Sequence, residues 1–307
     1  MNTTNNHQAT RNALTGAALV AIAALGFSSK PILIKLAYAN NPQVDAISLM
    51  ALRMVLSLPF FLLAAFWRSG NSARHRGTDW GAIIALGLMG YYLASLLDFS
   101  SLKYLPANLE RLILFLYPTL VILLSAVIYR KPVSPAKRRA LLLSYAGMTL
   151  VFIRSGAIAG AADIPLGAAL VFGSALVFAL FLIGSGYVMQ RFGSMRFTAY
   201  SMSVACIATL THFAITRPLE QLLVSGQLLL LAVVLALFAT VLPAFALNAG
   251  IQRIGAGRAS IISAAGPVAT LIMAWAILGE TLAPLQLVGA TMVLTGVLLI
   301  SLSKETT

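Results

Sequence analysis

Charge is scarce in this sequence, and acidic charge is the scarcest of all. The 307 residues include 21 Lys and Arg but only 8 Asp and Glu, so charged residues make up 9% of the chain and hydrophobic residues 60%. Soluble globular domains carry about 25% charged and about 45–50% apolar residues. The apolar excess is too large for a soluble core to bury, so the composition indicates a polytopic membrane protein.

Cysteine and cofactor-binding motifs are also missing. Cys206 is the single cysteine and lies in an apolar run, which excludes a disulfide within the chain and a cysteine metal cluster. No metal-ligand spacing and no glycine-rich phosphate loop occurs, so we predict no metal, no cofactor and no use of ATP. The net charge of +13 comes without basic stretches interleaved with aromatic residues, which argues against nucleic acid as a partner.

The residues needed by the known intramembrane proteases are absent as well. An aspartyl protease needs two embedded aspartates, and only Asp98 lies deep in an apolar stretch. A rhomboid-like protease needs a Gly-x-Ser-Gly context, but Ile183 occupies the first glycine position before Ser185 in "LIGSGYV". We therefore predict that the protein is not an enzyme.

Long apolar runs are what the chain has in abundance. A membrane-spanning helix needs about 20 mostly apolar residues. The runs are continuous rather than alternating, which favours helices over a β-barrel. Residues 1–12 are polar and expected to be disordered, and no convincing cleavage site follows them, so the first run is interpreted as a span. The ten predicted spans cover residues 13–38, 45–67, 80–102, 106–129, 137–154, 165–190, 196–216, 226–252, 257–279 and 283–303.

The basic residues lie mainly on one side of these spans. The side of the N-terminus collects Arg11, Arg68, Arg74, Arg76, Arg130, Lys131, Lys137, Arg138, Arg139, Arg191, Arg196, Arg253, Arg258 and Lys304. The other side has Lys103, Arg111, Arg154 and Arg217 near its loops. Because cytoplasmic loops carry the excess of Lys and Arg, we predict that both termini are cytoplasmic and that the protein is a multi-pass protein of the cell inner membrane.

The sequence also contains an internal repeat. "GAALVAIAALGFSSKPI" at 16–32 aligns with "GAALVFGSALVFALFLI" at 167–183, and Pro118 and Gly147 align with Pro267 and Gly296 at a shift of 149. This predicts two five-helix repeats, residues 13–154 and 165–303. Since five is odd, the second repeat must be inverted in the membrane. Inverted repeats recur in secondary transporters, with the substrate site near the bilayer midplane.

The repeats also support a family resemblance. The segments "LKYLPANLERLILFLYPTLVILLSAVIYRKPVSP" and "IQRIGAGRASIISAAGPVATLIMAWAILGETLAP" resemble the drug/metabolite transporter superfamily, in particular its EamA-type members. The first copy has "YRKPVSP" where the second has "LGETLAP". The resemblance implies an exporter with a central cavity lined mainly by spans 1, 3, 4, 6, 8 and 9. It also implies that spans 5 and 10 are peripheral and that the protein is a monomer or a homodimer.

Five ionisable side chains lie inside the predicted spans of the first repeat. Asp98, Glu110 and Arg111 lie about one turn, roughly 6 Å, inside the outer ends of spans 3 and 4. Lys30 and Arg53 lie roughly 12 Å inside the outer ends of spans 1 and 2. An ionisable residue in a span is by default a functional-site hypothesis, because leaving it in hydrocarbon costs several kcal/mol.

Two interpretations of these charges stay open. In the structural one, Asp98 pairs with Arg111 or Lys30, and Glu110 pairs with Arg53, without any ligand. In the functional one, the three cations outnumber the two acids, and the one surplus positive charge would bind a carboxylate or a phosphate of the solute. The acids could then hold an ammonium group or a proton. Amino acids and related zwitterions fit this pattern best.

The remaining candidates are aromatic, amide and proline residues. Tyr91 shares a helix face with Asp98, Tyr117 shares one with Glu110, and Asn248 is an amide at depth. Each is a candidate solute contact or a packing residue. Pro31 is expected to kink span 1 at mid-depth and to act as a hinge, and Pro118 and Pro267 are expected to let spans 4 and 9 bend.

Together these features predict a secondary active transporter of a small polar metabolite that works by alternating access. Its partners would be a small-molecule solute, the lipid bilayer and, if Asp98 or Glu110 titrates, protons. The alternative is a membrane protein that does not transport, such as a scramblase or an assembly factor, in which the buried charges are structural.

Overall fold

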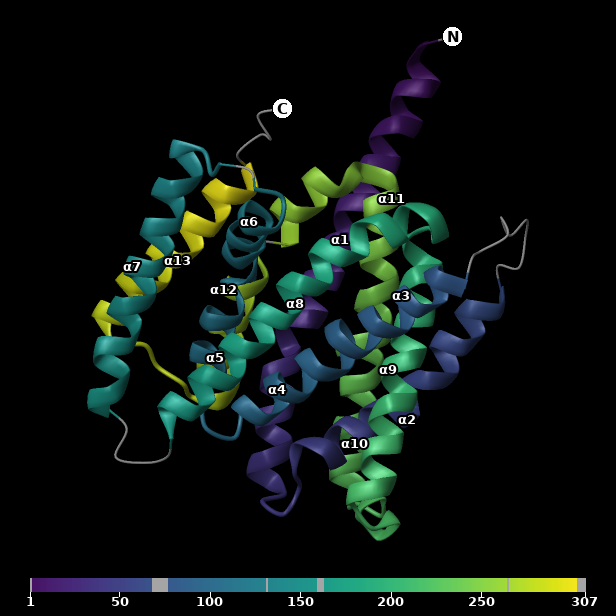
Figure 1. The fold of residues 1–307 in the computed structure, drawn as a ribbon, viewed down its shortest axis with the longest axis vertical. Coiled ribbons are helices and arrows are strands. Elements are labelled where there is room, and N and C mark those ends of the chain that lie inside the picture. Colours follow the sequence, from purple (N-terminus) through teal and green to yellow (C-terminus); the bar gives the residue numbers. More distant parts are fainter. Residues whose placement is uncertain (1, 68–76, 131, 159–162, 264, 303–307) are drawn as a thin grey trace.

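The structure, a computed structural model, describes residues 2–67, 77–130, 132–158, 163–263 and 265–302. Within these ranges it contains helices and no β-strand (Figure 1). The first half comprises α1 (Asn2–Asn40), α2 (Ala46–Trp67), α3 (Gly77–Gly87), the π-helix η1 (Leu88–Leu93), α4 (Ala94–Ser101), α5 (Ala107–Leu114), α6 (Tyr117–Ile128) and α7 (Pro135–Ile158). The second half comprises α8 (Ile164–Phe192), α9 (Ser194–Thr216), the short 3₁₀-helix η2 (Leu219–Leu222), α10 (Gly226–Ala236), the π-helix η3 (Leu237–Val241), α11 (Leu242–Ser263), α12 (Gly266–Leu278) and α13 (Pro284–Leu302).

The helices confirm an all-α membrane protein. Seven helical segments are long and apolar enough to cross a bilayer: residues 11–40, 46–66, 77–101, 107–128, 164–186, 194–216 and 226–255. Residues 266–278 and 284–299 form shorter apolar helices. Helix α7, with 24 residues, is not among these seven segments. The total of ten spans therefore stays a prediction.

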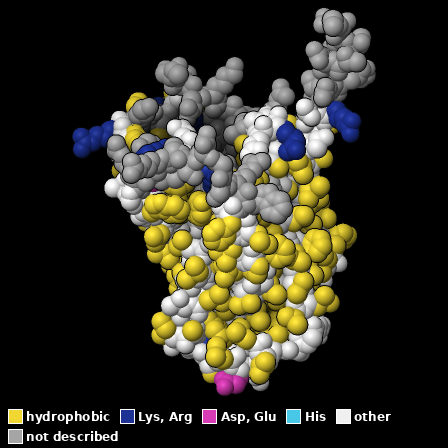
Figure 2. All heavy atoms as spheres, turned by 90° about the vertical axis from the view of Figure 1, so that its right-hand side faces the viewer, with side chains coloured by type: hydrophobic (Ala, Val, Ile, Leu, Met, Phe, Trp, Pro, Cys, Tyr) yellow, Lys and Arg dark blue, Asp and Glu magenta, His cyan; other side chains and the backbone are white. Residues whose placement is uncertain are grey.

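One face of the molecule divides along its long axis. On this face an apolar band covers the middle, with Lys and Arg side chains toward the upper end and an acidic side chain at the lower end (Figure 2). The start of α1 and the end of α13 lie at the upper end (Figure 1). Residues 2–12, which we expected to be disordered, belong to the continuous helix α1.

The helices of the two halves pack in equivalent pairs. Helix α7 packs against α13, and α2 packs against α9, so the fifth span meets the tenth and the second meets the seventh. The contact of α1 with α11 corresponds to that of α8 with α4, and the contact of α1 with α12 corresponds to that of α8 with α6. Exchanging the halves therefore reproduces these main helix pairs.

Helix irregularities recur at the spacing of the repeat. The π-helices η1 and η3 begin at Leu88 and Leu237, which are 149 residues apart. Helix α5 ends at Leu114 and α11 at Ser263, again 149 residues apart, and each is followed by a break and a new helix. Regular helices do not break at matching positions without a shared cause, so these pairs support an origin by duplication.

Helices α7 and α13 approach each other closely at two glycines. A Cβ atom added to Gly147 would lie 2.6 Å from the carbonyl oxygen of Gly289, and one added to Gly289 would lie 2.5 Å from the carbonyl oxygen of Gly147. In a membrane, where apolar side chains gain little by leaving lipid, such backbone contact is a main source of helix association.

The substitution Gly147→Val is therefore expected to separate α7 from α13 and to lower folded yield and thermal stability in detergent. Gly81→Val is the matched control, since a Cβ at Gly81 meets no atom within 4 Å and the helix-propensity cost of valine is the same. Fluorescence-detected size exclusion after heating measures both variants. Equal losses in the two variants would contradict a close contact between these helices.

Candidate functional site

The deepest contact between opposite charges joins α1 to α4. The Lys30 Nζ lies 2.5 Å from Oδ2 of Asp98, and only 2% of the Asp98 side chain and 18% of the Lys30 side chain are exposed. The sequence left open whether Asp98 pairs with Lys30 or with Arg111, and the structure contains the pair with Lys30. The alternative pair of Asp98 with Arg111 is not found among the described residues, because the Arg111 guanidinium donates elsewhere.

Arg111 binds a backbone carbonyl of α1. Its Nη2 donates to the carbonyl oxygen of Phe27 at 2.9 Å. In a regular helix the N–H of residue 31 would occupy that oxygen, but Pro31 has no N–H. Helix α1 runs without a break from Asn2 to Asn40, so the chain stays helical at Pro31, and the kink expected there stays a prediction. The proline leaves an acceptor in mid-helix that a cation from α5 satisfies.

The broken ninth span is attached to α1 next to the same place. The Ser28 hydroxyl donates to the carbonyl oxygen of Gly266 at 2.7 Å, and the Thr270 hydroxyl donates to the carbonyl oxygen of Ser28 at 3.1 Å. Consecutive carbonyls of α1, those of Phe27 and Ser28, therefore hold the fourth and ninth spans. These are the two spans that break at equivalent positions.

Glu110 is the most isolated charge-bearing group of the site. It is fully buried, and its carboxyl lies within hydrogen-bonding range of the Asp98 carboxyl. Among the described residues no donor reaches either Glu110 oxygen or Oδ1 of Asp98. The alternative pair of Glu110 with Arg53 is therefore not made either.

Arg53 lies against an aromatic ring instead of a carboxylate. The carbon at the centre of its guanidinium lies 4.5 Å from the centre of the Phe99 ring, and the residue is 3% exposed. A ring face attracts a cation, and this attraction strengthens when water is absent. Its Nε and Nη2 have no hydrogen-bond acceptor within the described part of the chain. Arg53 thus has donors available for an anionic ligand.

The two candidate tyrosines join an aromatic cluster on α8. Tyr91 packs edge-on against Phe181 with ring centres 5.0 Å apart, and Tyr117 packs edge-on against Phe178 at 5.2 Å. Phe178 and Phe181 are themselves stacked. Packing therefore accounts for the rings of both tyrosines, and a role in binding solute stays a prediction.

Asn248 lies away from the charged residues. It accepts a hydrogen bond from the Ser194 hydroxyl, and its Nδ2 donates to the Ala244 carbonyl at 2.9 Å and reaches the Thr198 hydroxyl at 3.3 Å. Gly26 and Val20 of α1 lie opposite Pro243 and Gly250 of α11. This register places Asn248 about two turns, roughly 12 Å, from the level of Lys30. The amide joins α11 to α9, which is the structural alternative that the sequence left open.

Pro118 and Pro267 lie at the helix breaks of the fourth and ninth spans. Helix α5 ends at Leu114 and α6 begins at Tyr117, with Pro118 in its first turn. Helix α12 likewise begins at Gly266 with Pro267 in its first turn. The positions of the two breaks agree with the sequence prediction, while bending at them stays a prediction.

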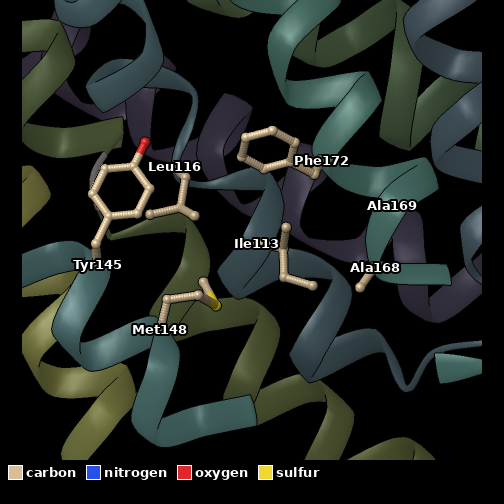
Figure 3. Close-up of a pocket in the computed structure, with 7 residues that line it drawn as sticks. All are labelled: Ile113, Leu116, Tyr145, Met148, Ala168, Ala169 and Phe172. Atoms are coloured by element: carbon tan, nitrogen blue, oxygen red, sulfur yellow. The ribbon is translucent and has the colours of Figure 1, made fainter. Parts of the chain in front are cut away.

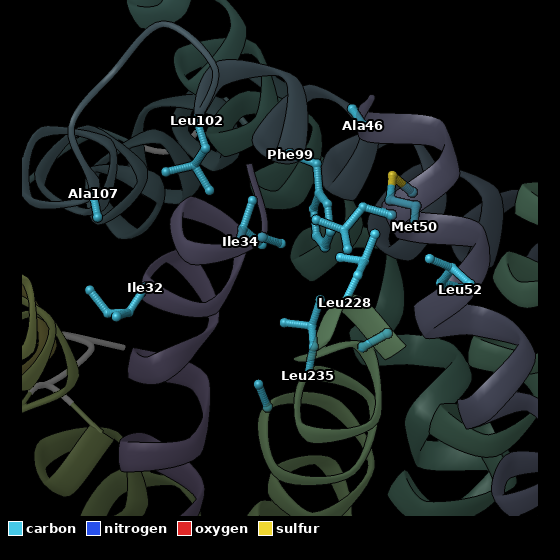
Figure 4. Close-up of a cluster of buried hydrophobic side chains, with 14 of the residues drawn as sticks. Ile32, Ile34, Ala46, Met50, Leu52, Phe99, Leu102, Ala107, Leu228 and Leu235 are labelled. Atoms are coloured by element: carbon cyan, nitrogen blue, oxygen red, sulfur yellow. The ribbon is translucent and has the colours of Figure 1, made fainter. Parts of the chain in front are cut away.

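An apolar plug covers the charged residues on one side. It consists of buried side chains from α1, α2, α4, α5 and α10 that include Ile32, Ile34, Met50, Phe99, Leu102, Ala107, Leu228 and Leu235 (Figure 4). The plug residues of α1 come after Lys30 in the sequence, and those at α4 come after Asp98. The plug residues of α2 come before Arg53, and that of α5 comes before Glu110. All of them therefore lie toward the loops that follow α1 and α4. Packed apolar side chains therefore lie between the charged residues and these loops.

A separate cavity of about 310 Å³ lies between α5, α7 and α8 (Figure 3). It is lined by Ile113, Leu116, Tyr145, Met148, Ala168, Ala169 and Phe172. The only polar side-chain atom in this lining is the tyrosine hydroxyl, which accepts a hydrogen bond from Thr119 at 3.2 Å. A cavity of this composition suits hydrocarbon, so it is not the site of a polar solute.

Comparison with known proteins decides the family. The sequence profile of the EamA-like transporter family matches residues 14–153 and, a second time, residues 165–302. The chain belongs to the EamA-like transporter family. This EamA-like chain is 32% identical over 287 residues to "Uncharacterized transporter YcbK" of Bacillus subtilis, covering 91% of this chain and 90% of the relative.

Two further proteins agree with this placement. "Uncharacterized transporter sll1319" of Synechocystis is 24% identical to the EamA-like chain, covering 95% of this chain and 94% of the relative. A solved crystal structure, 18% identical, matches with a TM-score of 0.63 and covers 92% of this chain and 95% of its own, which supports the fold alone. The family and the relatives support a transporter role for this multi-pass membrane protein.

Glu280 of the EamA-like chain makes a contact that the sequence did not indicate. Its two carboxylate oxygens accept from the backbone N–H groups of Ala107 at 2.8 Å and Asn108 at 2.9 Å. These are the first residues of α5, the helix that carries Glu110 and Arg111. Gly279, with φ of 67°, ends α12 and turns the chain toward this position. The signal in the sequence was "LGETLAP" itself, which has an acid where the first repeat has Lys131.

Lys35 also has a partner that the sequence did not indicate. Its ammonium donates to the carbonyl oxygens of Leu105 at 3.1 Å and Leu102 at 3.3 Å, just beyond the C-terminal end of α4. A cation there compensates carbonyls that the helix leaves unpaired. Together with Glu280 it fixes the short loop between α4 and α5.

Replacing Glu280 tests whether this residue of the second repeat holds α5, the helix of the first repeat that carries Glu110 and Arg111, in position. Glu280→Gln removes the negative charge from the start of α5, and we expect a loss of stability of about 1–2 kcal/mol, as for other N-terminal caps. Glu220→Gln, at an exposed position in η2, is the matched control. Thermal unfolding of both purified variants in one detergent is the measurement. Equal stability of the two would refute the capping role.

Proposed function

We propose that this protein is a secondary active transporter that moves a small polar solute, an amino-acid-like zwitterion or another organic anion, by alternating access. The observation that carries the proposal is the buried group of Lys30, Arg53, Asp98, Glu110 and Arg111, in which only one ion pair is made. A purely structural set of charges would be expected to satisfy its donors and acceptors, since each unpaired buried group costs free energy. Export as the direction rests on the resemblance to EamA-type transporters.

The unsatisfied donors suit an anionic group. Nε and Nη2 of Arg53 and Nε of Arg111 are buried without acceptors among the described residues. Guanidinium N–H groups form strong, oriented hydrogen bonds with carboxylates. A carboxylate between these two arginines would supply the missing acceptors. The oxygens of Asp98 and Glu110 that lack donors would suit the ammonium end of a zwitterion.

Alternating access requires a second conformation of similar free energy. The equivalent helix pairs of the two halves, 13–154 and 165–303, support a two-fold relation in which the repeats are inverted. Under this proposal the apolar plug opens while the equivalent surfaces of the second half close. The breaks before Pro118 and Pro267 would absorb the change in helix direction.

Orientation follows from the position of the cations. On the face shown in Figure 2, Lys and Arg gather toward the end of the molecule where α1 begins and α13 ends (Figures 1 and 2). By the preference of basic loops for the cytoplasm, we propose that this end faces the cytoplasm of a cell with the protein in its inner membrane. The plug would then close the site from the outside, and the conformation would be occluded toward the exterior.

Counterflow in proteoliposomes tests the proposal. Vesicles loaded with unlabelled amino acids or organic acids are expected to take up the labelled solute in a saturable way. Lys30→Gln and Arg53→Gln are expected to reduce that uptake at least about tenfold, because each removes a buried charge worth more than about 1.4 kcal/mol to binding. Lys103→Gln, which changes an exposed lysine in the loop after α4, is the matched control.

The outcome separates transport from the alternative. If folded wild-type protein shows no counterflow with any of these pools, the site is structural, as in a scramblase or an assembly factor. If counterflow occurs and the buried and exposed variants lose it equally, the buried charges are not the solute site.

A further inference from the structure

The two buried carboxyls face each other without a donor between them. Glu110 lies within hydrogen-bonding range of Asp98, and both Glu110 oxygens and Oδ1 of Asp98 lack donors among the residues described. Carboxylates only accept hydrogen bonds. Two ionised carboxylates at this distance and depth would repel each other and lose their hydration. A proton on one of them makes the hydrogen bond possible.

The neighbouring cations do not supply that bond. Lys30 of α1 is engaged by the other oxygen of Asp98, Oδ2. The Arg111 guanidinium, one residue along the chain from Glu110, donates to the Phe27 carbonyl. Arg53 of α2 lies over the Phe99 ring. Within the described part of the chain, these three cations, the hydroxyl of Tyr38 near Asp98 and that of Tyr117 near Arg111 are the charged and titratable groups around the carboxyl pair.

We infer that Asp98 and Glu110 share a single proton, which makes the carboxyl pair a proton-binding site in the wall of the solute site. The two groups titrate as one unit, so the proton belongs to the pair rather than to either residue. This arrangement follows the general behaviour of carboxyl pairs that cannot both ionise at short distance. The proton site rests on the contacts alone, whereas its coupling to solute movement rests on the proposed function.

The surroundings also provide a way to release the proton. Lys30 keeps 18% of its side chain exposed, and Arg111 is only partly buried, so both can move when the site opens. If either cation turns toward Glu110, it stabilises the doubly ionised pair, and the shared proton leaves the pair for water. An ammonium group brought between the carboxyls has the same effect. Opening or solute binding would therefore change the number of bound protons by one.

Infrared titration of the purified protein tests the proton site without any solute. The C=O stretching band of a protonated carboxyl is expected in wild-type protein at neutral pH, where exposed carboxyls are ionised. Glu110→Gln should lose that band, and Asp163→Asn, at an exposed position before α8, should keep it. Asp98→Asn supplies a donor to Glu110 and is expected to shift or abolish the band. A wild-type protein without the band, or Glu110→Gln with an unchanged band, would overturn the inference.

A second measurement separates this inference from the proposed function. Wild-type vesicles carrying an internal pH indicator and loaded with an amino acid are diluted into solute-free buffer, and solute and proton movement are followed together. Solute efflux with a matching proton movement supports coupling, and efflux without it overturns coupling while transport stands. If no solute moves at all, the proposed function fails, and the infrared result still decides the proton site.

Discussion

An ammonium and a carboxylate buried among apolar helices can both stay charged only when they are paired, and Lys30 and Asp98 form such a pair. Removing one partner of a buried pair typically costs about 3–5 kcal/mol, because it leaves an uncompensated charge. The contact fixes α1 against α4 at one depth and one rotation. The contacts of the other charged groups depend on the pairing of Asp98 with Lys30. Once Asp98 holds Lys30, Arg111 must bind elsewhere, and Glu110 is left facing a carboxyl.

Helix α1 is the element to which both broken spans, the fourth and the ninth, are attached. Arg111 binds its Phe27 carbonyl, which is free because of Pro31, and the broken ninth span binds at Ser28. Both contacts are single hydrogen bonds or small groups of them, each worth about 1 kcal/mol net, or somewhat more when charged. Contacts of that strength can be exchanged during a conformational change without unfolding the helix. The same stretch of α1 thus carries the buried ammonium and the attachment points of both broken spans.

The sequence predicted much of the class of fold and the identity of the buried charges, because both follow from composition and from depth along a helix. It did not predict which charges pair. The depth of a residue in its span can be counted at 1.5 Å per residue. Which opposite charge it meets depends on how its helix is rotated and on which helix lies beside it. Asn248 shows this limit, since its depth suggested the site while its neighbours Ser194 and Thr198 belong to another contact.

Other features were visible in the sequence, but their contacts were not. The missing N–H of Pro31 was expected to kink α1, and in the structure it also frees the Phe27 carbonyl oxygen for Arg111 in a helix that runs without a break. The acid of "LGETLAP" was seen as part of a motif, but its binding to the start of α5 links segments 172 and 173 residues apart in sequence, which local pattern cannot show. The paired helix breaks were located correctly because proline acts on its own helix.

The central claim is that buried charges between α1, α2, α4 and α5 form a solute site that opens through the apolar plug. The most direct test is the accessibility of a cysteine placed in the plug. In a Cys206→Ser background, Ile34→Cys would be exposed to a membrane-impermeant maleimide from the side of the loop after α1. The account predicts little reaction at rest, since Ile34 is fully buried, and faster reaction during solute counterflow. Counterflow that proceeds at full rate while Ile34→Cys stays unreactive from that side would contradict it.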